Sequence, residues 1–168
     1  MKRGRWQGVT AVRFGLGLAG LALMITVIGL WAVPWYRDLQ VQNKVAEVFV
    51  AVDACRKEVD KVVHSTSAPA LSTSLFVCDG GASSGATISR YLRSIAVRAT
   101  GAITVAVDHH SLPELTLATS TLTIVPMLGE KTALRSSDVG KTILAWRCGS
   151  PEDGTTIPRK YLPSNCRP

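Results

Sequence analysis

The amino-terminal part of this chain lacks acidic residues, and for one long stretch it lacks charge altogether. No Asp or Glu precedes residues 14–33, and none of those twenty residues is charged. This is the length that a helix needs to cross about 30 Å of hydrocarbon. We therefore predict a transmembrane helix over residues 14–33.

A basic segment, residues 1–13, comes before the apolar run. Its basic side chains are Lys2, Arg3, Arg5 and Arg13. A basic flank stays in the cytoplasm, so we expect residues 1–13 to be a leader or cytoplasmic flank and the rest of the chain to be exported. The run could instead be a cleaved secretory signal, but the bulky Trp31, Pro34 and Trp35 are unlike the small residues at such a cleavage site.

The combinations of residues that enzymes and metal sites use are scarce. The four cysteines form no CxxC pair, which is the spacing typical of structural zinc sites. Residues 79–85 are rich in glycine but lack the Lys of a phosphate-binding loop. His109 and His110 are adjacent, and adjacent side chains do not share a face, so we expect a solvated turn there. We predict no enzymatic activity, no cofactor and no metal.

Four cysteines in an exported domain of this size indicate two disulfides. Three pairings are possible. Cys148 and Cys166 enclose a short segment near the carboxyl terminus, and a bond from Cys55 to Cys78 would pin a helix to the loop that follows it.

The formal net charge of +7 raises the question of an acidic partner. The four bases of residues 1–13 account for more than half of that excess, and membrane topology explains their position. A basic cluster does remain near the carboxyl terminus, with Glu152 and Asp153 close to it. It consists of Arg147, Arg159, Lys160 and Arg167.

Beyond the apolar run, residues 34–63 predict an amphipathic continuation of the same helix. Apolar residues recur there at alternating steps of four and three, which places them on one stripe. They are Val41, Val45, Val48, Val52, Cys55, Val59 and Val62. We expect the carboxyl-terminal part of the stripe to pack on this protein's own sheet and the remainder to contact neighbouring copies. Pro34 should kink the helix or start a new segment.

Residues 64–168 predict one globular domain. Residues 64–85 have the composition of a loop, and residues 149–168 are irregular because four prolines interrupt them. Strands are expected at 91–98, 102–107, within 114–125 where Pro126 ends the strand, and at 142–148. A short hairpin loop at 99–101 joins the first two. The fold class is α+β, with one helix covering a single face of a four-stranded antiparallel meander.

With these features the chain resembles the type IV pilins over nearly its whole length. Pro34-Trp35-Tyr36 is similar to the step where pilin helices leave the membrane. The carboxyl end resembles the ending of pseudomonad and neisserial major pilins through Ala145-Trp146-Arg147-Cys148-Gly149, Lys160-Tyr161-Leu162-Pro163 and Asn165-Cys166-Arg167. The resemblance implies a disulfide-bounded surface loop at 148–166 and subunits that pack helix against helix into a filament.

The amino end departs from the family pattern. Pilins have a leader that ends in Gly, and the fifth residue after the cut is a glutamate. Gly8 and Val9 provide the best match, so the cut would fall between them and the new amine would be methylated. Arg13 then stands where the family has the glutamate. A second alignment starts near residues 13–14, without a preceding Gly. Arg13 would reach the cytoplasmic headgroups and hold the helix as an anchor.

The resemblance implies a pilus subunit with roles in adhesion, motility or surface contact. Its partners would be other pilin subunits, the pilus assembly machinery and the inner membrane. The alternative is a membrane-anchored protein that does not polymerise and captures DNA through the basic residues near the carboxyl terminus, in which case binding would weaken with salt.

Overall fold

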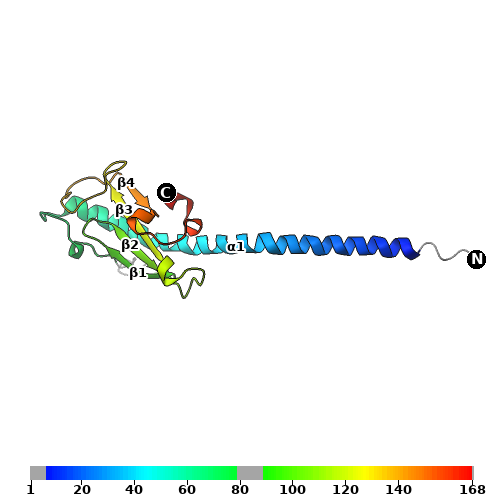
Figure 1. Ribbon diagram of the computed structural model, residues 1–168. Coiled ribbons are helices and arrows are strands. Elements are labelled where there is room, and N and C mark those ends of the chain that lie inside the picture. The colour runs from blue at the N-terminus through cyan, green and yellow to red at the C-terminus, as the bar shows by residue number, and fades with distance from the viewer. Residues whose placement is uncertain (1–6, 79–88, 168) are drawn as a thin grey trace, which may run out of the picture. The chain divides into compact units, whose positions relative to one another are not determined.

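The structure is a computed structural model that describes the backbone of residues 7–78 and 89–167 and the side chains of residues 20–78 and 89–167. One long helix, α1 (Gln7–Ser65), precedes four strands (Figure 1). The strands are β1 (Leu92–Val97), β2 (Ile103–Val107), β3 (Thr121–Met127) and β4 (Ala145–Cys148). The chain divides into two compact units, Met1–Leu39 and Gln40–Pro168.

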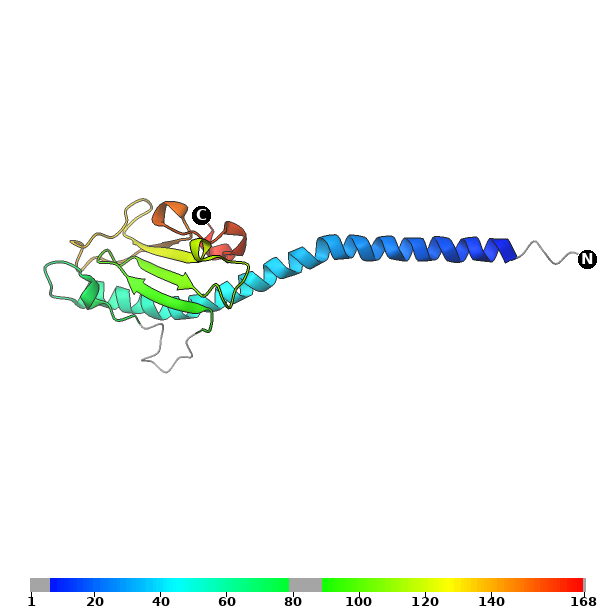
Figure 2. The ribbon, with the colours of Figure 1, turned by 60° about the horizontal axis from the view of Figure 1, so that its bottom comes forward.

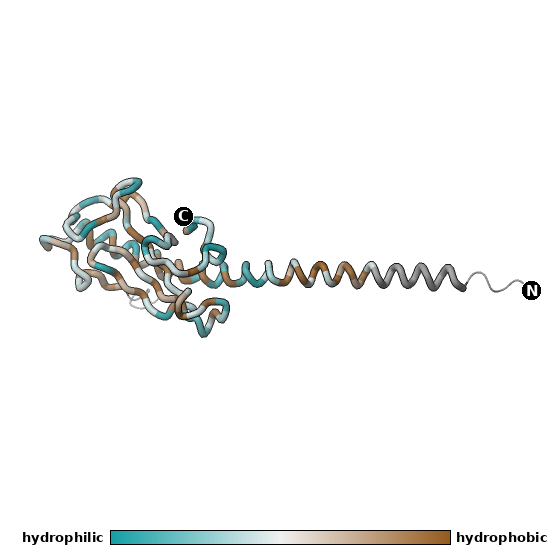
Figure 3. Tube along the Cα trace, viewed as in Figure 1, coloured by the Kyte–Doolittle hydropathy of each residue, from teal (hydrophilic) through white to brown (hydrophobic). Residues whose placement is uncertain are grey.

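The first unit contains the amino-terminal part of α1. The helix continues through Pro34, which therefore starts no new segment. From Gly20 onward, the described helix contains an 18-residue window that is long and apolar enough to cross a membrane, with a mean hydropathy of 1.3. Its large apolar side chains are exposed, from Trp31 at 79% to Val33 at 50%. Figure 3 shows this band in brown.

The second unit is a four-stranded antiparallel sheet with the strand order β1-β2-β3-β4, packed against the carboxyl-terminal part of α1. Figure 2 shows that part of the helix running along one side of the sheet. Val105 pairs with Leu122, and Ile124 pairs with Cys148. The α+β prediction of a long helix on a four-stranded antiparallel meander is confirmed.

The core lies between the helix and the sheet. Alternate residues of β2 and β3 point toward α1, as the period of two along a strand requires. Ile103, Val105, Val107 and Leu122 have no exposed surface, and Ile124 has almost none. These side chains pack against the valines of α1 in a single hydrophobic cluster.

Pro126 lies inside β3, so the prediction that it ends the third strand is wrong. The pairing of β3 with β2 ends at Ile124 and Ile103. On that edge the Pro126 carbonyl instead accepts a hydrogen bond from the Leu134 backbone N–H at 2.9 Å. Because β2 no longer pairs at this position, the donor that proline lacks removes no bond of the sheet.

The predicted loop at 99–101 has the expected form. The Arg98 backbone N–H donates to the Ala102 carbonyl at 2.9 Å, and Gly101 adopts a φ of 71°. Downstream, residues 149–167 include three short 3-10 turns, at Pro151–Asp153, Arg159–Tyr161 and Ser164–Cys166. The glycine-rich residues 79–85 lie outside the described part of the chain.

Candidate functional site

The valine stripe of α1 is buried within its own unit. Val41, Val45, Val48, Val52 and Val59 have no exposed surface, and Cys55 is 3% exposed. The expectation that the amino-terminal part of the stripe contacts neighbouring copies is therefore not met. The carboxyl-terminal segment reaches this part of the helix, since the Gln42 side-chain amide donates to the Lys160 carbonyl at 2.6 Å.

The stripe changes position at its carboxyl-terminal end. Val62, which the four-three spacing assigns to the stripe, is only partly buried, whereas Val63 has no exposed surface. The Val63 carbonyl also accepts a hydrogen bond from the Gly140 backbone N–H at 2.8 Å. The loop that carries Gly140 is thus bonded to the last turn of α1, and the Val63 side chain belongs to the main core.

All four cysteines form disulfides, in one of the three pairings that their number allows. Cys55 on α1 is bonded to Cys78, with a Cα–Cα distance of 5.2 Å. Cys148 at the end of β4 is bonded to Cys166, with a Cα–Cα distance of 4.8 Å. The first bond holds the helix against the segment that follows it, and the second closes residues 148–166 into a loop.

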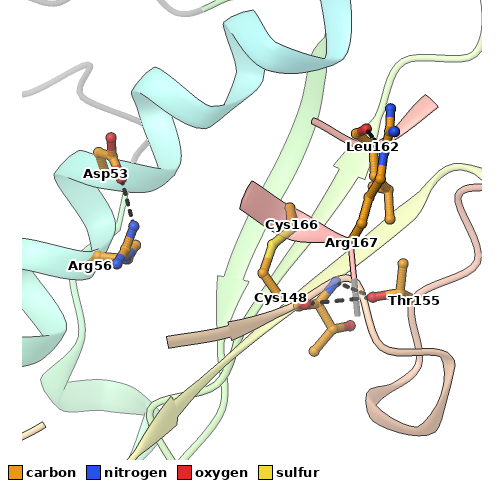
Figure 4. Close-up of a disulfide and its surroundings, with 8 residues drawn as sticks. Asp53, Arg56, Cys148, Thr155, Leu162, Cys166 and Arg167 are labelled. Atoms are coloured by element: carbon orange, nitrogen blue, oxygen red, sulfur yellow. Dashed lines mark hydrogen bonds and ion pairs between the residues drawn. A yellow bond between two sulfur atoms is a disulfide. The ribbon is translucent and has the colours of Figure 1, made fainter. Parts of the chain in front are cut away.

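The loop at 148–166, which we call the carboxyl-terminal loop, is held by its own buried side chains. Ile157, Tyr161 and Leu162 are each less than 10% exposed, and they belong to the main core. The Thr155 hydroxyl accepts a hydrogen bond from the Thr123 backbone N–H of β3 at 3.1 Å (Figure 4). The loop is therefore part of the fold, and its surface side chains stand on a fixed backbone.

The four basic residues near the carboxyl terminus have different environments. The Arg147 guanidinium binds Asp153 at two points, and this hydrogen bonding raises the pKa of Arg147. Arg167 Nε donates to the Leu162 carbonyl at 2.7 Å, as Figure 4 shows. Lys160 Nζ lies 4.5 Å from the centroid of the Tyr161 ring. Because Arg147 is already paired with Asp153, it is not available to bind an anionic ligand. Of the basic cluster near the carboxyl terminus, this leaves Arg159, Lys160 and Arg167 as candidates.

A small cavity next to the disulfide of the carboxyl-terminal loop was not predicted. It has a volume of about 310 Å³ and lies between α1 and β4. The Arg56 guanidinium lies 5.1 Å from the centroid of the Trp146 ring and 3.0 Å from Asp53 Oδ1. Asp53 and Arg56 are three residues apart on a helix, and this spacing is the one signal that the sequence offers for the pair.

His109 and His110 lie in the turn that follows β2. Their ring centroids are 4.2 Å apart, so the expectation that adjacent side chains diverge is wrong at this position. Asp108 precedes them, and its carboxylate accepts a hydrogen bond from the Ser111 hydroxyl at 2.7 Å. That bond is the main reason that the pKa of Asp108 is lowered.

A family model described as pilin, a bacterial filament protein, matches residues 42–167. The chain therefore belongs to the pilin family. Among solved structures it is similar to the crystal structure of a type IV pilin from Pseudomonas aeruginosa, with a TM-score of 0.52 and 19% sequence identity. That similarity covers 76% of this chain and 97% of the Pseudomonas chain, and at this identity it shows the fold. No curated protein matches the sequence.

The family model does not include the amino-terminal residues, so their processing is argued from the sequence alone. Arg13 lies within α1, as do Gly8 and Val9, but their side chains are outside the described residues. Lys2, Arg3 and Arg5 lie outside the described part of the chain altogether. The cut between Gly8 and Val9 stays a prediction.

Proposed function

We propose that this chain is a structural subunit of a type IV pilus filament that the inner membrane holds before assembly. The single observation that carries the proposal is the exposed apolar surface of the first unit. Leu23, Met24 and Ile28 on this part of α1 are each more than half exposed. A contiguous apolar surface of this kind needs lipid or other apolar helices to cover it.

The proposed membrane arrangement follows the charge pattern. Residues 1–13 lie in the cytoplasm, residues 14–33 span the inner membrane, and residues 34–63 continue the helix into the periplasm. Residues 64–168 form the periplasmic domain, where disulfides are stable. Cleavage between Gly8 and Val9 and methylation of the new amine would precede assembly by the pilus machinery, and the assembled subunits would be extracellular.

In the filament, the span would exchange its lipid contacts for contacts with the spans of other subunits. Gly20 and Gly29 leave open space on the helix surface, because a Cβ at either position would meet no atom within 4 Å. Small residues of this kind allow helices to approach closely. The valine stripe of residues 41–63 is already covered, so the self-association surface is the span and not the stripe.

The carboxyl-terminal loop would carry surface contacts, including adhesion or motility. Arg159 and Lys160 are exposed on its 3-10 turn, over a backbone that the disulfide and the Gln42 hydrogen bond hold. DNA capture by a protein that does not polymerise would use the same residues. The ion pair of Arg147 weakens that alternative, because it neutralises one of the four bases on which it depends.

Crosslinking tests whether the spans of neighbouring subunits pack together in filaments. Since all four native cysteines are in disulfides, the variant Ile25→Cys carries one free thiol, on a side chain that is 61% exposed. Because each chain then offers one thiol, a bifunctional maleimide should join this variant into covalent dimers in filaments sheared from cells, as the spans of neighbouring subunits lie side by side there. Wild-type chain, which has no free thiol, is the matched control.

The outcomes distinguish the two functions. A chain that stays in the membrane fraction and gives no crosslinked dimer contradicts the filament proposal. If such a chain also binds duplex DNA and loses that binding at high salt, the tethered receptor is supported instead. The mass of the mature amino terminus separately tests processing, since a methylated species that begins at Val9 is expected.

A further inference from the structure

The turn after β2 brings together three residues with metal-binding side chains. Asp108, His109 and His110 each offer one ligand atom, and these atoms all lie within 4.8 Å of one another. Two imidazoles and one carboxylate are ligands typical of zinc and the neighbouring first-row divalent metals. Calcium and magnesium prefer sites built from oxygen atoms alone.

The carboxylate is held in place by the backbone of the same turn. Asp108 Oδ1 accepts from the His110 backbone N–H at 3.2 Å. Asp108 Oδ2 accepts from the backbone N–H and the hydroxyl of Ser111, at 3.2 and 2.7 Å. A carboxylate has about four acceptor positions, so it keeps capacity for a further ligand. Hydrogen bonds to a ligating side chain orient it and strengthen metal binding.

The imidazole of His109 has an unused nitrogen. His109 Nδ1 is buried and has no hydrogen-bond partner among the described residues. A buried polar atom without a partner costs free energy, and a metal ion bound at Nδ1 itself would supply that partner. The neighbouring ring of His110 is exposed, so an ion can reach the turn from solvent.

We propose that the turn of residues 108–110 binds one divalent transition-metal ion, such as Zn²⁺, through Asp108, His109 and His110. Ligand atoms in a tetrahedral zinc site lie about 3.3 Å apart, given zinc–nitrogen distances of about 2.0–2.1 Å. The three atoms lie within 4.8 Å of one another, so binding requires side-chain rotation, for which the exposed His110 has room. Water or a group from another molecule completes the coordination. The site is separate from the carboxyl-terminal loop and does not depend on filament formation.

The chain offers a matched control, because it contains only three histidines. The third, His64, is exposed on α1, with Nε2 3.8 Å from Asp60 Oδ1. We would titrate Zn²⁺ into the full chain in detergent micelles, without a histidine tag, by isothermal titration calorimetry. One ion per chain is expected. His109→Ala and His110→Ala should each weaken the affinity at least tenfold, whereas His64→Ala should leave it unchanged.

Cobalt provides a second measurement. Co²⁺ bound by two imidazoles and a carboxylate should give visible absorption bands that His110→Ala removes. Since His110 is exposed, this variant should keep the native circular dichroism spectrum, and it decides the question if His109→Ala fails to fold. The proposal is overturned if zinc does not bind, if either turn variant binds as tightly as wild type, or if His64→Ala removes the binding.

Discussion

Arg147 and Asp153 form a two-point ion pair, with Arg147 Nε 2.7 Å from Asp153 Oδ2 and Nη2 2.6 Å from Oδ1. Arg147 belongs to β4, and Asp153 to the first 3-10 turn of the carboxyl-terminal loop. The Asp153 side chain is only 11% exposed. The pair therefore fixes the start of the loop to the edge strand of the sheet.

Removing the acid of this pair should destabilise the domain. Asp153→Asn is expected to lower the free energy of unfolding by about 1 kcal/mol, the upper end for a partly exposed ion pair. Chemical denaturation of the full chain in detergent, followed by near-ultraviolet circular dichroism, would measure it. Glu152→Gln is the matched control, since it removes the same charge from an exposed neighbour, and equal effects of the two changes would contradict the role of the pair.

Shortening a valine of the stripe should leave a cavity in the core. Val52→Ala is expected to lower the free energy of unfolding by about 2 kcal/mol, because Val52 has no exposed surface. Val50→Ala, two residues earlier and 71% exposed, should change it by less than about 0.5 kcal/mol. The same denaturation experiment compares them, and a large effect at Val50 would mean that this face is covered in the full chain.

Gly149 should tolerate no side chain. Its φ is +78°, and a Cβ would overlap the Cys166 carbonyl and lie 2.8 Å from Leu162 Cδ1. Gly140 has a similar φ of +77° but open space around it. Gly140→Ala should cost about 1 kcal/mol from backbone strain alone, and Gly149→Ala clearly more, with slower formation of the Cys148–Cys166 bond. Thermal melts and thiol quantification would test both, and equal melting temperatures would refute the steric argument.

At acidic pH, protonation of Asp138 should remove the contribution of its carboxylate to the stability of the folded domain. Lys141 Nζ donates to Asp138 Oδ1 at 2.8 Å and the Arg135 backbone N–H donates to Oδ2 at 2.8 Å, and these bonds lower the pKa of Asp138 from its ordinary 3.8. Because the native pKa lies below the unfolded one, the stabilisation is present above about pH 4 and is lost as pH falls through the native pKa.

The variant Asp138→Asn isolates this effect. Its deficit in unfolding free energy relative to wild type should be largest near neutral pH and should shrink below pH 4, as denaturation at several pH values would show. A deficit that stays constant down to pH 2 would mean that protonation of Asp138 is not the cause.

The sequence predicted the architecture because its signals are local and periodic. The steps of four and three along α1 placed Val41 to Val59 on one buried face, and the predicted strand at 102–107 contains β2 (Ile103–Val107). The sequence pattern gave wrong predictions where contacts with residues distant in the sequence determine burial or strand pairing. Val63 is buried in the main core in place of Val62, and the distant Gly140 donates a hydrogen bond to its carbonyl. Pro126 stays in β3 because Leu134 replaces β2 as the partner of its carbonyl.

The surface chemistry was less accessible from the sequence. Counting bases near the carboxyl terminus put Arg147 among residues open to a ligand, although Asp153 engages it. Whether a nearby acid pairs with a base depends on a turn whose geometry no spacing rule predicts. The rule that neighbours diverge holds for regular elements, and His109 and His110 lie in a turn.

The two disulfides affect how the second unit, Gln40–Pro168, would respond to pulling. A load applied through α1 and carried across the bond from Cys55 to Cys78 bypasses the intervening segment, and the bond from Cys148 to Cys166 likewise shields its loop. The enclosed segments, with sequence separations of 23 and 18, cannot be extended by the load. Under tension these two segments therefore add no length to the chain until their sulfur–sulfur bonds are reduced.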